Sequence, residues 1–301
     1  MSKYYNFYNN DDDISLKNEI EERSLLTDFL NEDIGTGDIT SNILIDEKIE
    51  ANAKIICKDD GEIVISGLSE AKMIFEICNC NSTLLVNDGD LLKKGTSVMI
   101  IQGPARSILK AERTALNLIM HMSGISTKTS QFVKKLGEFS KFVRVSSTRK
   151  TSPGLRYFDK KSVVLGGGIS HRIRLDQLVL IKDNHIAIVG SVNKAIQSIR
   201  SKFGSARKIE CEVSDYRGII DAINSGADIV MLDNFTPELA HSSIEKITNL
   251  GLRNKVIIEI SGGVTLDNIY EYASSIPDVI SVGSLTHSFQ SIDFSLEISS
   301  S

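Results

Sequence analysis

The chain has 301 residues, of which 24% are charged and 41% hydrophobic, and its formal net charge at pH 7 is −5. This composition is typical of a globular protein with one large α/β domain and a smaller companion, and it excludes wholesale disorder. An acidic surface repels phosphates, which argues against a nucleic-acid partner. No run approaches the ~20 apolar residues of a membrane span, and the polar N-terminus lacks the apolar segment of a signal peptide, so we predict a cytoplasmic protein with no membrane partner.

The cysteines and the more isolated histidines do not form a zinc site. Only one residue separates Cys78 from Cys80, whereas paired zinc ligands are usually two to four residues apart, and no second pair follows. We therefore expect reduced cysteines and no zinc. This interpretation covers Cys57, Cys78, Cys80, Cys211, His185, His241 and His287.

The N-terminal part of the chain predicts a small domain of mixed α and β structure. Apolar residues at helical spacing indicate a helix over residues 14–30, and Pro104 suits the start of a later helix, which we expect to end at Gly124. The polar stripe of that later helix includes Arg113, which spacing alone assigns to a solvated face. Strands are expected over residues 53–58, 61–66 and 97–101, and a further helix over residues 68–78.

From about residue 140, short apolar runs alternate with amphipathic helices, which indicates βα units and a parallel sheet. Several of these runs lead straight into polar residues. In a parallel α/β barrel the ligand lies at the carboxyl ends of the strands, where such residues would converge; a doubly wound open sheet is the competing architecture. Strands are expected over residues 142–146, 178–181, 208–213, 228–232, 256–260 and 279–282, and helices over 191–202, 215–224, 237–250 and 265–274.

The segment from Ser147 to Ile186 concentrates positive charge in an otherwise acidic chain. The Gly-Gly-Gly turn within it, at residues 166–168, does not fit the dinucleotide-binding fingerprint. So many cations repel one another unless an anion offsets them, and arginine forks suit carboxylates and phosphates. We therefore predict a pocket for a polyanionic small molecule, with Arg149, Lys150, His171, Arg172 and Lys182 as its candidate residues.

Two later turns are candidate phosphate sites. Ser261-Gly262-Gly263 follows a strand and precedes Thr265, which we expect to begin a helix, and bare backbone amides at a helix N-terminus can cradle a phosphate. Gly283 and Ser284, after the last strand, offer a second wall, as late loops often do in barrels. The alternative is that both are plain turns.

A pair of acidic residues falls on one strand. Glu210 and Glu212 lie two residues apart, so their side chains share a face, and Asp233 ends the next strand. Carboxylates at adjacent strand ends can hold Mg²⁺ or the hydroxyls of a sugar. A salt bridge to a neighbouring lysine is the alternative, and it is the stronger alternative for Glu210.

Eight motifs in order along residues 32–288 resemble the quinolinate phosphoribosyltransferase family, a group of type II phosphoribosyltransferases. The motifs are EDIGTGDITS, ERTALNLIMHMSGIST, TRKTSPGLR, GGGISHR, LIKDNHI, GADIVMLDNF, ISGGVTLDNI and ISVGSLTHS. The resemblance implies a mixed α/β N-terminal domain, residues 14–125, on which the tail 289–301 would pack, and an incomplete α/β barrel, residues 126–288. It also implies a homodimer, or a multiple of dimers, whose active sites are completed by the neighbouring subunit.

The resemblance assigns roles to the candidate residues. The pyridine dicarboxylate would contact Arg149, His171, Arg172 and Lys182, together with Arg113 of the neighbouring subunit. The catalytic residues would be Lys150, which contacts phosphoribosyl pyrophosphate, and Glu212 and Asp233, which hold its ribose hydroxyls and Mg²⁺. The 5′-phosphate would be held by Ser261, Gly262, Gly263, Gly283 and Ser284. The segment around Glu210 departs from the family's usual pattern, which leaves open whether Glu210 or Glu212 faces the ribose.

The activity implied by the resemblance is transfer of phosphoribose from phosphoribosyl pyrophosphate to quinolinate, with Mg²⁺, in NAD biosynthesis. Its products are nicotinate mononucleotide, pyrophosphate and CO₂. Two alternatives are enzymes: a relative associated with molybdate transport, and a phosphoribosyltransferase for another pyridine or azole carboxylate. A third alternative is a non-catalytic ligand-binding protein on the same fold.

Overall fold

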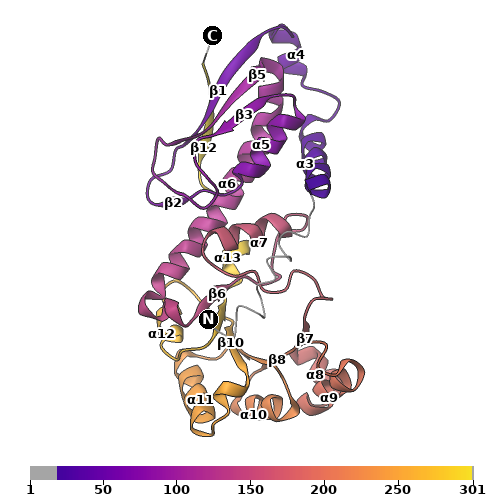
Figure 1. Ribbon diagram of the computed structural model, residues 1–301, viewed down its shortest axis with the longest axis vertical. Coiled ribbons are helices and arrows are strands. Elements are labelled where there is room, and N and C mark those ends of the chain that lie inside the picture. Colours follow the sequence, from indigo (N-terminus) through magenta and orange to yellow (C-terminus); the bar gives the residue numbers. More distant parts are fainter. Residues whose placement is uncertain (1–18, 300–301) are drawn as a thin grey trace. The chain divides into compact units, whose positions relative to one another are not determined.

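The computed structural model describes residues 19–299, which fall into two compact units (Figure 1). The parallel-sheet unit comprises residues 131–160 and 167–287. The antiparallel-sheet unit comprises residues 19–130, 161–166 and 288–299. Residues 14–18 of the first expected helix lie outside the described residues, and that helix runs as α3 over Glu19–Ile34.

The parallel-sheet unit is built on six strands in the order β6-β11-β10-β9-β8-β7. The first of these strands in the chain, β6, pairs with the last, β11, as in a barrel that closes. The ring stays open between β6 and β7, where an isolated bridge from Ser146 to Ile169 extends the sheet on the β6 side. The fold is therefore the incomplete parallel α/β barrel that was predicted. Its strands are β6 (Arg144–Ser146), β7 (Val179–Ile181), β8 (Ile209–Val213), β9 (Ile229–Asp233), β10 (Ile257–Ser261) and β11 (Val279–Ser281).

The helices between these strands begin and end at local capping signals. Asp215 accepts a hydrogen bond from the backbone N–H of Gly218 at the start of α10, and Gly226 ends that helix with a left-handed conformation. The helix buries Ile219 and Ile223, its apolar face. The helices of this unit are α8 (Asp183–Val189), α9 (Val192–Phe203), α10 (Tyr216–Ser225), α11 (Pro237–Asn249), α12 (Ile269–Ala273) and α13 (Ser284–His287), with 3-10 turns η1 (Gly137–Lys141) and η2 (Arg253–Lys255).

The amino-terminal ends of the strands are fastened by two aspartates. Asp228 accepts a hydrogen bond from the backbone N–H of Ile209 at 2.8 Å and pairs with Arg200. Asp278 accepts from the N–H of Ile258 at 2.7 Å and pairs with Arg253 at 2.8 Å. Barrels use this edge for stability, which leaves the opposite, carboxyl edge for chemistry.

The antiparallel-sheet unit brings distant parts of the chain together. Its main sheet has the order β12-β1-β5-β3, so the C-terminal strand β12 pairs with β1. The alternating burial along β1 packs one face of this sheet into a core that includes Ile55, Phe75 and Ile101. Its elements are α3, α4 (Ile39–Leu44), β1 (Glu50–Cys57), β2 (Ile63–Val64), α5 (Leu68–Ile77), β3 (Asn81–Leu84), β4 (Leu91–Leu92), β5 (Ser97–Pro104) and β12 (Phe294–Ser299).

Gly124 does not end the helix after Pro104, contrary to the prediction. Helix α6 runs through it, over Ala105–Lys135. A Cβ on Gly124 would lie 2.4 Å from the backbone oxygen of Gln290 and 2.8 Å from the ring of Phe289. The glycine therefore allows close packing against the C-terminal segment and does not act as a C-cap. Residues of α6 and of α7 (Arg156–Leu165) belong to both units.

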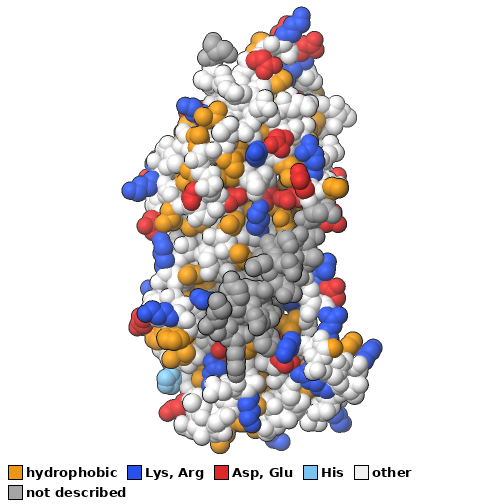
Figure 2. Space-filling view, in the orientation of Figure 1, with side chains coloured by type: hydrophobic (Ala, Val, Ile, Leu, Met, Phe, Trp, Pro, Cys, Tyr) orange, Lys and Arg blue, Asp and Glu red, His pale blue; other side chains and the backbone are white. Residues whose placement is uncertain are grey.

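The described surface carries no large field of one sign on the face drawn in Figure 2, where basic and acidic side chains are interspersed. Within residues 19–299, no helix combines the length and the apolarity that crossing a membrane requires.

Candidate active site

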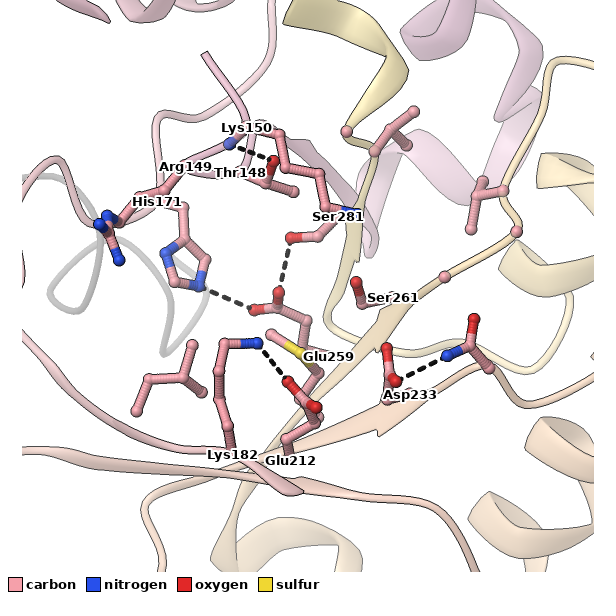
Figure 3. Close-up of a pocket in the computed structure, with 18 of the residues that line it drawn as sticks. Thr148, Arg149, Lys150, His171, Lys182, Glu212, Asp233, Glu259, Ser261 and Ser281 are labelled. Atoms are coloured by element: carbon pink, nitrogen blue, oxygen red, sulfur yellow. Dashed lines mark hydrogen bonds and ion pairs between the residues drawn. The ribbon is translucent and has the colours of Figure 1, made fainter. Parts of the chain in front are cut away.

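A cavity of about 740 Å³ lies at the carboxyl edge of the parallel sheet. In Figure 3, Arg149 and His171 lie on one side of it, and Asp233 and Ser261 lie on the other. Of the residues to which the resemblance assigns a role, every one except Arg113 lines the cavity: Arg149, Lys150, His171, Arg172, Lys182, Glu212, Asp233, Ser261, Gly262, Gly263, Gly283 and Ser284.

The first side of the cavity is strongly cationic. The Nε atom of Arg149 is buried and makes no hydrogen bond to the described residues. Arg172 is buried and donates to the backbone oxygen of Leu178 at 2.8 Å. Behind them Lys160 is fully buried, and its pKa is lowered to about 7, first by burial and then by the charges of Arg156 and Arg149. A bound anion would relieve this crowding of positive charge.

His171 is held in an unusual conformation. Its φ of 50° lies in the left-handed region, which is uncommon for a residue other than glycine. The buried Lys160 ammonium donates to the backbone oxygens of Ser170 and His171 and so fixes this turn. The N–H of Arg172 donates to Nδ1 of His171 at 2.7 Å, which places the ring proton on Nε2.

His171 is not one more positive charge, contrary to our expectation. Burial lowers its pKa to about 4; Glu259 opposes this shift, and the cations Lys160, Arg172 and Lys182 add to it. The ring is therefore neutral at pH 7. The one proton of the neutral ring, on Nε2, faces the carboxylates of Glu210 and Glu259, at 3.2 Å and 3.6 Å.

Three glutamates on strands β8 and β10 differ in how they lie relative to the cavity. Glu212 lines the cavity, and its Oε2 lies 2.6 Å from Nζ of Lys182. Glu210 is fully buried, does not line the cavity, and has its Oε2 atom 3.2 Å from Nε2 of His171. Glu259 is also fully buried, 3.6 Å from the same Nε2, and accepts from Ser281 at 2.5 Å. Of the two acids on β8, only Glu212 therefore faces the cavity. Glu210 is buried behind the cavity lining, next to His171.

Replacing Glu210 with glutamine is expected to stabilise the protein more at pH 8 than at pH 5. Burial raises the pKa of Glu210 to about 8, although Arg172 and Lys182 oppose this shift. Between pH 4.5 and 8 the folded chain keeps a proton that the unfolded chain releases, so this carboxyl makes the wild type less stable as pH rises through that window. Glutamine removes that loss. Thermal melting across this range measures it.

Glu271→Gln, an exposed change on α12, is the matched control, and its effect on Tm should be the same at both pH values. His171 is present in both the wild type and Glu210→Gln, so its own titration contributes little to the comparison. A difference in Tm between Glu210→Gln and wild type that does not grow with pH would contradict the protonated, buried carboxyl.

The glycine turn after β10 is shaped by its neighbours. Gly262 and Gly263 have φ values of 93° and 65°, which only glycine adopts readily. The expected helix start at Thr265 is wrong. The N–H of Thr265 donates to the side chain of Asn268 at 2.8 Å, and α12 begins only at Ile269. The turn closed by Asn268 uses the backbone N–H of Thr265 that a helix start would have left free. A phosphate in this loop would therefore meet the backbone N–H groups of the glycine turn and not those of a helix N-terminus.

A second glycine, Gly283, leaves room for a lysine. A Cβ at this position would lie 3.1 Å from Cδ of Lys150 and 3.1 Å from Nε2 of His287. The backbone oxygen of Lys150 accepts from Thr286 at 2.8 Å, which anchors the lysine beside this turn. Lys150 and the turn after β11 therefore face the same part of the cavity.

Asn234 and Glu259 are among the polar residues at the strand ends that we expected to converge, and both line the cavity. Sequence reasoning missed several other lining residues. His287 was considered only as a zinc ligand, and the small polar residues carry no pattern of their own. The missed lining residues include Thr148, Ser281 and His287.

Arg113 belongs to the antiparallel-sheet unit. It lies on α6 with its side chain 67% exposed, and its nearest charged partner among the described residues is the adjacent Glu112, at 3.5 Å. It is absent from the residues that line the cavity of its own chain.

The fold and the cavity place the protein among the parallel α/β-barrel proteins that bind anionic ligands at the carboxyl ends of their strands. Family models narrow this class. Residues 38–123 match the N-terminal domain of quinolinate phosphoribosyl transferase, and residues 125–297 match its C-terminal domain. The chain therefore belongs to the quinolinate phosphoribosyltransferase family, which confirms the family, the fold class and the prediction of an enzyme.

Individual relatives agree with the family models. A probable nicotinate-nucleotide pyrophosphorylase (carboxylating) of Methanocaldococcus jannaschii is 45% identical over 91% of this chain and 96% of its own. The human nicotinate-nucleotide pyrophosphorylase (carboxylating) is 36% identical over 78% of each chain. The solved structure of the Francisella tularensis nicotinate-nucleotide pyrophosphorylase matches with a TM-score of 0.86 and 35% identity, covering 95% of this chain and 99% of that one.

Proposed function

We propose that the protein transfers the phosphoribosyl group of phosphoribosyl pyrophosphate to quinolinate, forming nicotinate mononucleotide, pyrophosphate and CO₂. The names of the relatives point to this reaction. One observation supports it most directly: a single cavity has a cationic side, a carboxylate pair and a glycine turn. A pyridine dicarboxylate and a sugar phosphate need these three surfaces next to one another.

Quinolinate binds on the cationic side. Arg149 and Arg172 hold the ring carboxylates, Lys182 adds a third positive charge, and the neutral ring of His171 lines the same side of the cavity. Both substrates are anions, so these cations also offset the repulsion between them. Lys150 contacts phosphoribosyl pyrophosphate from the far wall, beside Gly283, and the turn of Ser261–Gly263 with Gly283 and Ser284 holds its 5′-phosphate.

The carboxylate pair fits the ribose hydroxyls and Mg²⁺. Burial raises the pKa of Asp233, and the negative charge of Glu212 raises it further. Two carboxylates that repel each other in one cavity are a donor set that suits a hard divalent cation. Glu212 and Asp233 would hold that ion, which neutralises negative charge on the departing pyrophosphate when it is bound.

The reaction needs positioning more than acid or base chemistry. The lone pair of the pyridine nitrogen forms the bond to the anomeric carbon as the carbon–oxygen bond breaks and its electrons leave on pyrophosphate. Glu212 and Asp233 stabilise positive charge that develops on the ribose. The ring nitrogen is then cationic and accepts the electrons of the C2–carboxylate bond, CO₂ departs, and C2 takes a proton from water. Holding the two substrates in line supplies much of the rate.

A homodimer would complete the site. Arg113 is exposed and outside the cavity of its own chain, and the same unit exposes the apolar residues Ile39, Ile43 and Leu44 of α4. Exposed apolar side chains near one another in sequence are typical of an association surface. In this arrangement Arg113 of each subunit reaches the cavity of the other.

Purified protein mixed with quinolinate, phosphoribosyl pyrophosphate and Mg²⁺ is expected to form nicotinate mononucleotide, and chelation of Mg²⁺ should stop the reaction. Chromatography of the products measures this. Nicotinate in place of quinolinate is the matched control, because it lacks the second carboxylate. Product from nicotinate alone, or from another azole carboxylate alone, would reject quinolinate as the substrate. Turnover of none of them would favour a binding protein.

A further inference from the structure

Asn234 joins the two halves of the sugar-phosphate side of the cavity. It follows Asp233 at the end of β9 and lines the cavity. Its side-chain amide donates to Oδ2 of Asp233 at 2.7 Å, a contact marked by the dashed line at Asp233 in Figure 3. Its backbone N–H donates to the oxygen of Ser261 at 2.8 Å, across to the next strand end.

The same side chain determines why residue 262 is a glycine. A Cβ on Gly262 would lie 2.2 Å from Oδ1 of Asn234 and 2.8 Å from its Cγ. The amide of Asn234 therefore occupies the place that a side chain at 262 would take, and it packs directly on the glycine turn. A turn supported in this way holds its amides in one arrangement before a ligand arrives.

Asn234 is itself fixed from below. Its φ of 56° is left-handed, a conformation that asparagine tolerates better than most residues. The next residue, Phe235, is buried, and its backbone oxygen accepts a hydrogen bond from the hydroxyl of Tyr272 at 2.8 Å. The side-chain amide of Asn234 therefore projects from a fixed turn. It contacts the carboxylate of Asp233 on one side and the Ser261–Gly263 turn on the other.

We propose that Asn234 is a positioning residue that sets the Asp233 carboxylate and the Ser261–Gly263 turn at a fixed separation, matched to the ribose and the 5′-phosphate of one ligand. This inference rests on the proposed function for the identity of that ligand. By donating to one oxygen of Asp233, the amide orients the other toward the hydroxyls. Asn234 affects the sugar phosphate first, because Arg149, which holds the dicarboxylate, lies on the other side of the cavity from Asp233.

Asn234→Gly tests the amide apart from the turn, since glycine keeps the left-handed backbone and removes the side chain. Isothermal titration of ribose 5-phosphate should show binding weakened by about tenfold or more, the scale of a lost hydrogen bond plus a loosened loop. Quinolinate binding should stay within about twofold, and Tm within a few degrees. Asn234→Asp should weaken ribose 5-phosphate more, because it puts a second negative charge beside Asp233.

Asn79→Gly is the matched control. Asn79 is exposed, has a φ of 61°, and lies after α5 in the other unit, so its change should alter neither ligand. Unchanged ribose 5-phosphate binding in Asn234→Gly would overturn the inference. So would a loss of quinolinate affinity as large as the loss of ribose 5-phosphate affinity, accompanied by a large fall in Tm. Either result would reduce Asn234 to a turn residue. If the wild type binds ribose 5-phosphate through Asn234 and yet forms no nicotinate mononucleotide, the inference holds and the proposed function fails.

Discussion

Replacing Arg149 with alanine is expected to lower kcat/KM for quinolinate by roughly a thousandfold, which corresponds to about 4 kcal/mol for an anion left without its cation. The Nε of Arg149 is buried at the cavity with no hydrogen-bond partner among the described residues, so the side chain is in place for a ligand. The loss should appear in quinolinate binding as well as in turnover. Steady-state kinetics with each substrate varied in turn measures it.

Two controls separate the pocket from the fold. Arg149→Lys keeps the charge but loses the planar fork, so it should fall between wild type and Arg149→Ala. Arg144→Ala changes an exposed arginine at the start of β6, the strand that precedes Arg149 in the chain, and should leave both kinetics and Tm nearly unchanged. If Arg149→Ala turned over quinolinate at a near-normal rate with a normal Tm, the dicarboxylate would have to bind elsewhere.

The meeting of the strand-end residues could be predicted without knowing any side-chain contact. Parallel strands of one sheet bring their carboxyl ends to one edge, so Lys182, Asp233 and Ser261 meet there once the βα rhythm is read correctly. The strand cores could be predicted for the same reason, since their apolar runs are continuous. The observed ends of these strands differ from the predicted ends by one or two residues, which is the usual uncertainty where the hydrogen bonding of a strand frays.

What could not be predicted depends on contacts between residues far apart in sequence. The neutrality of His171 results from its burial and from nearby cations, which outweigh the opposing charge of Glu259, and sequence spacing contains none of these distances. Gly124 looked like a helix end because its packing partner, Gln290, lies in the distant C-terminal segment. Thr265 did not begin a helix because Asn268 captured its N–H first. In each case a tertiary or local polar contact overrode a propensity.

Mixing two inactive variants is expected to restore about a quarter of wild-type activity, if each cavity uses an arginine from the other subunit. Arg113→Ala lacks the donated arginine, and Lys182→Ala lacks a cation of the cavity itself. Random reassociation makes about half of the dimers hybrids. In each hybrid one cavity carries both lesions and the other carries neither, so about half of the hybrid sites work.

The matched control mixes Lys182→Ala with Arg149→Ala. Both residues line the same chain's cavity, so every hybrid site keeps one lesion and the mixture should stay inactive. Differently tagged subunits, captured one after the other, show that hybrids have formed, and this captured fraction should have about half of the wild-type activity, because one of its two cavities is free of lesions. Confirmed hybrids of Arg113→Ala and Lys182→Ala without activity would contradict a shared site, because each cavity keeps one lesion when Arg113 serves the cavity of its own chain. Activity in both mixtures would instead show that the lesions are not confined to the cavities assigned here.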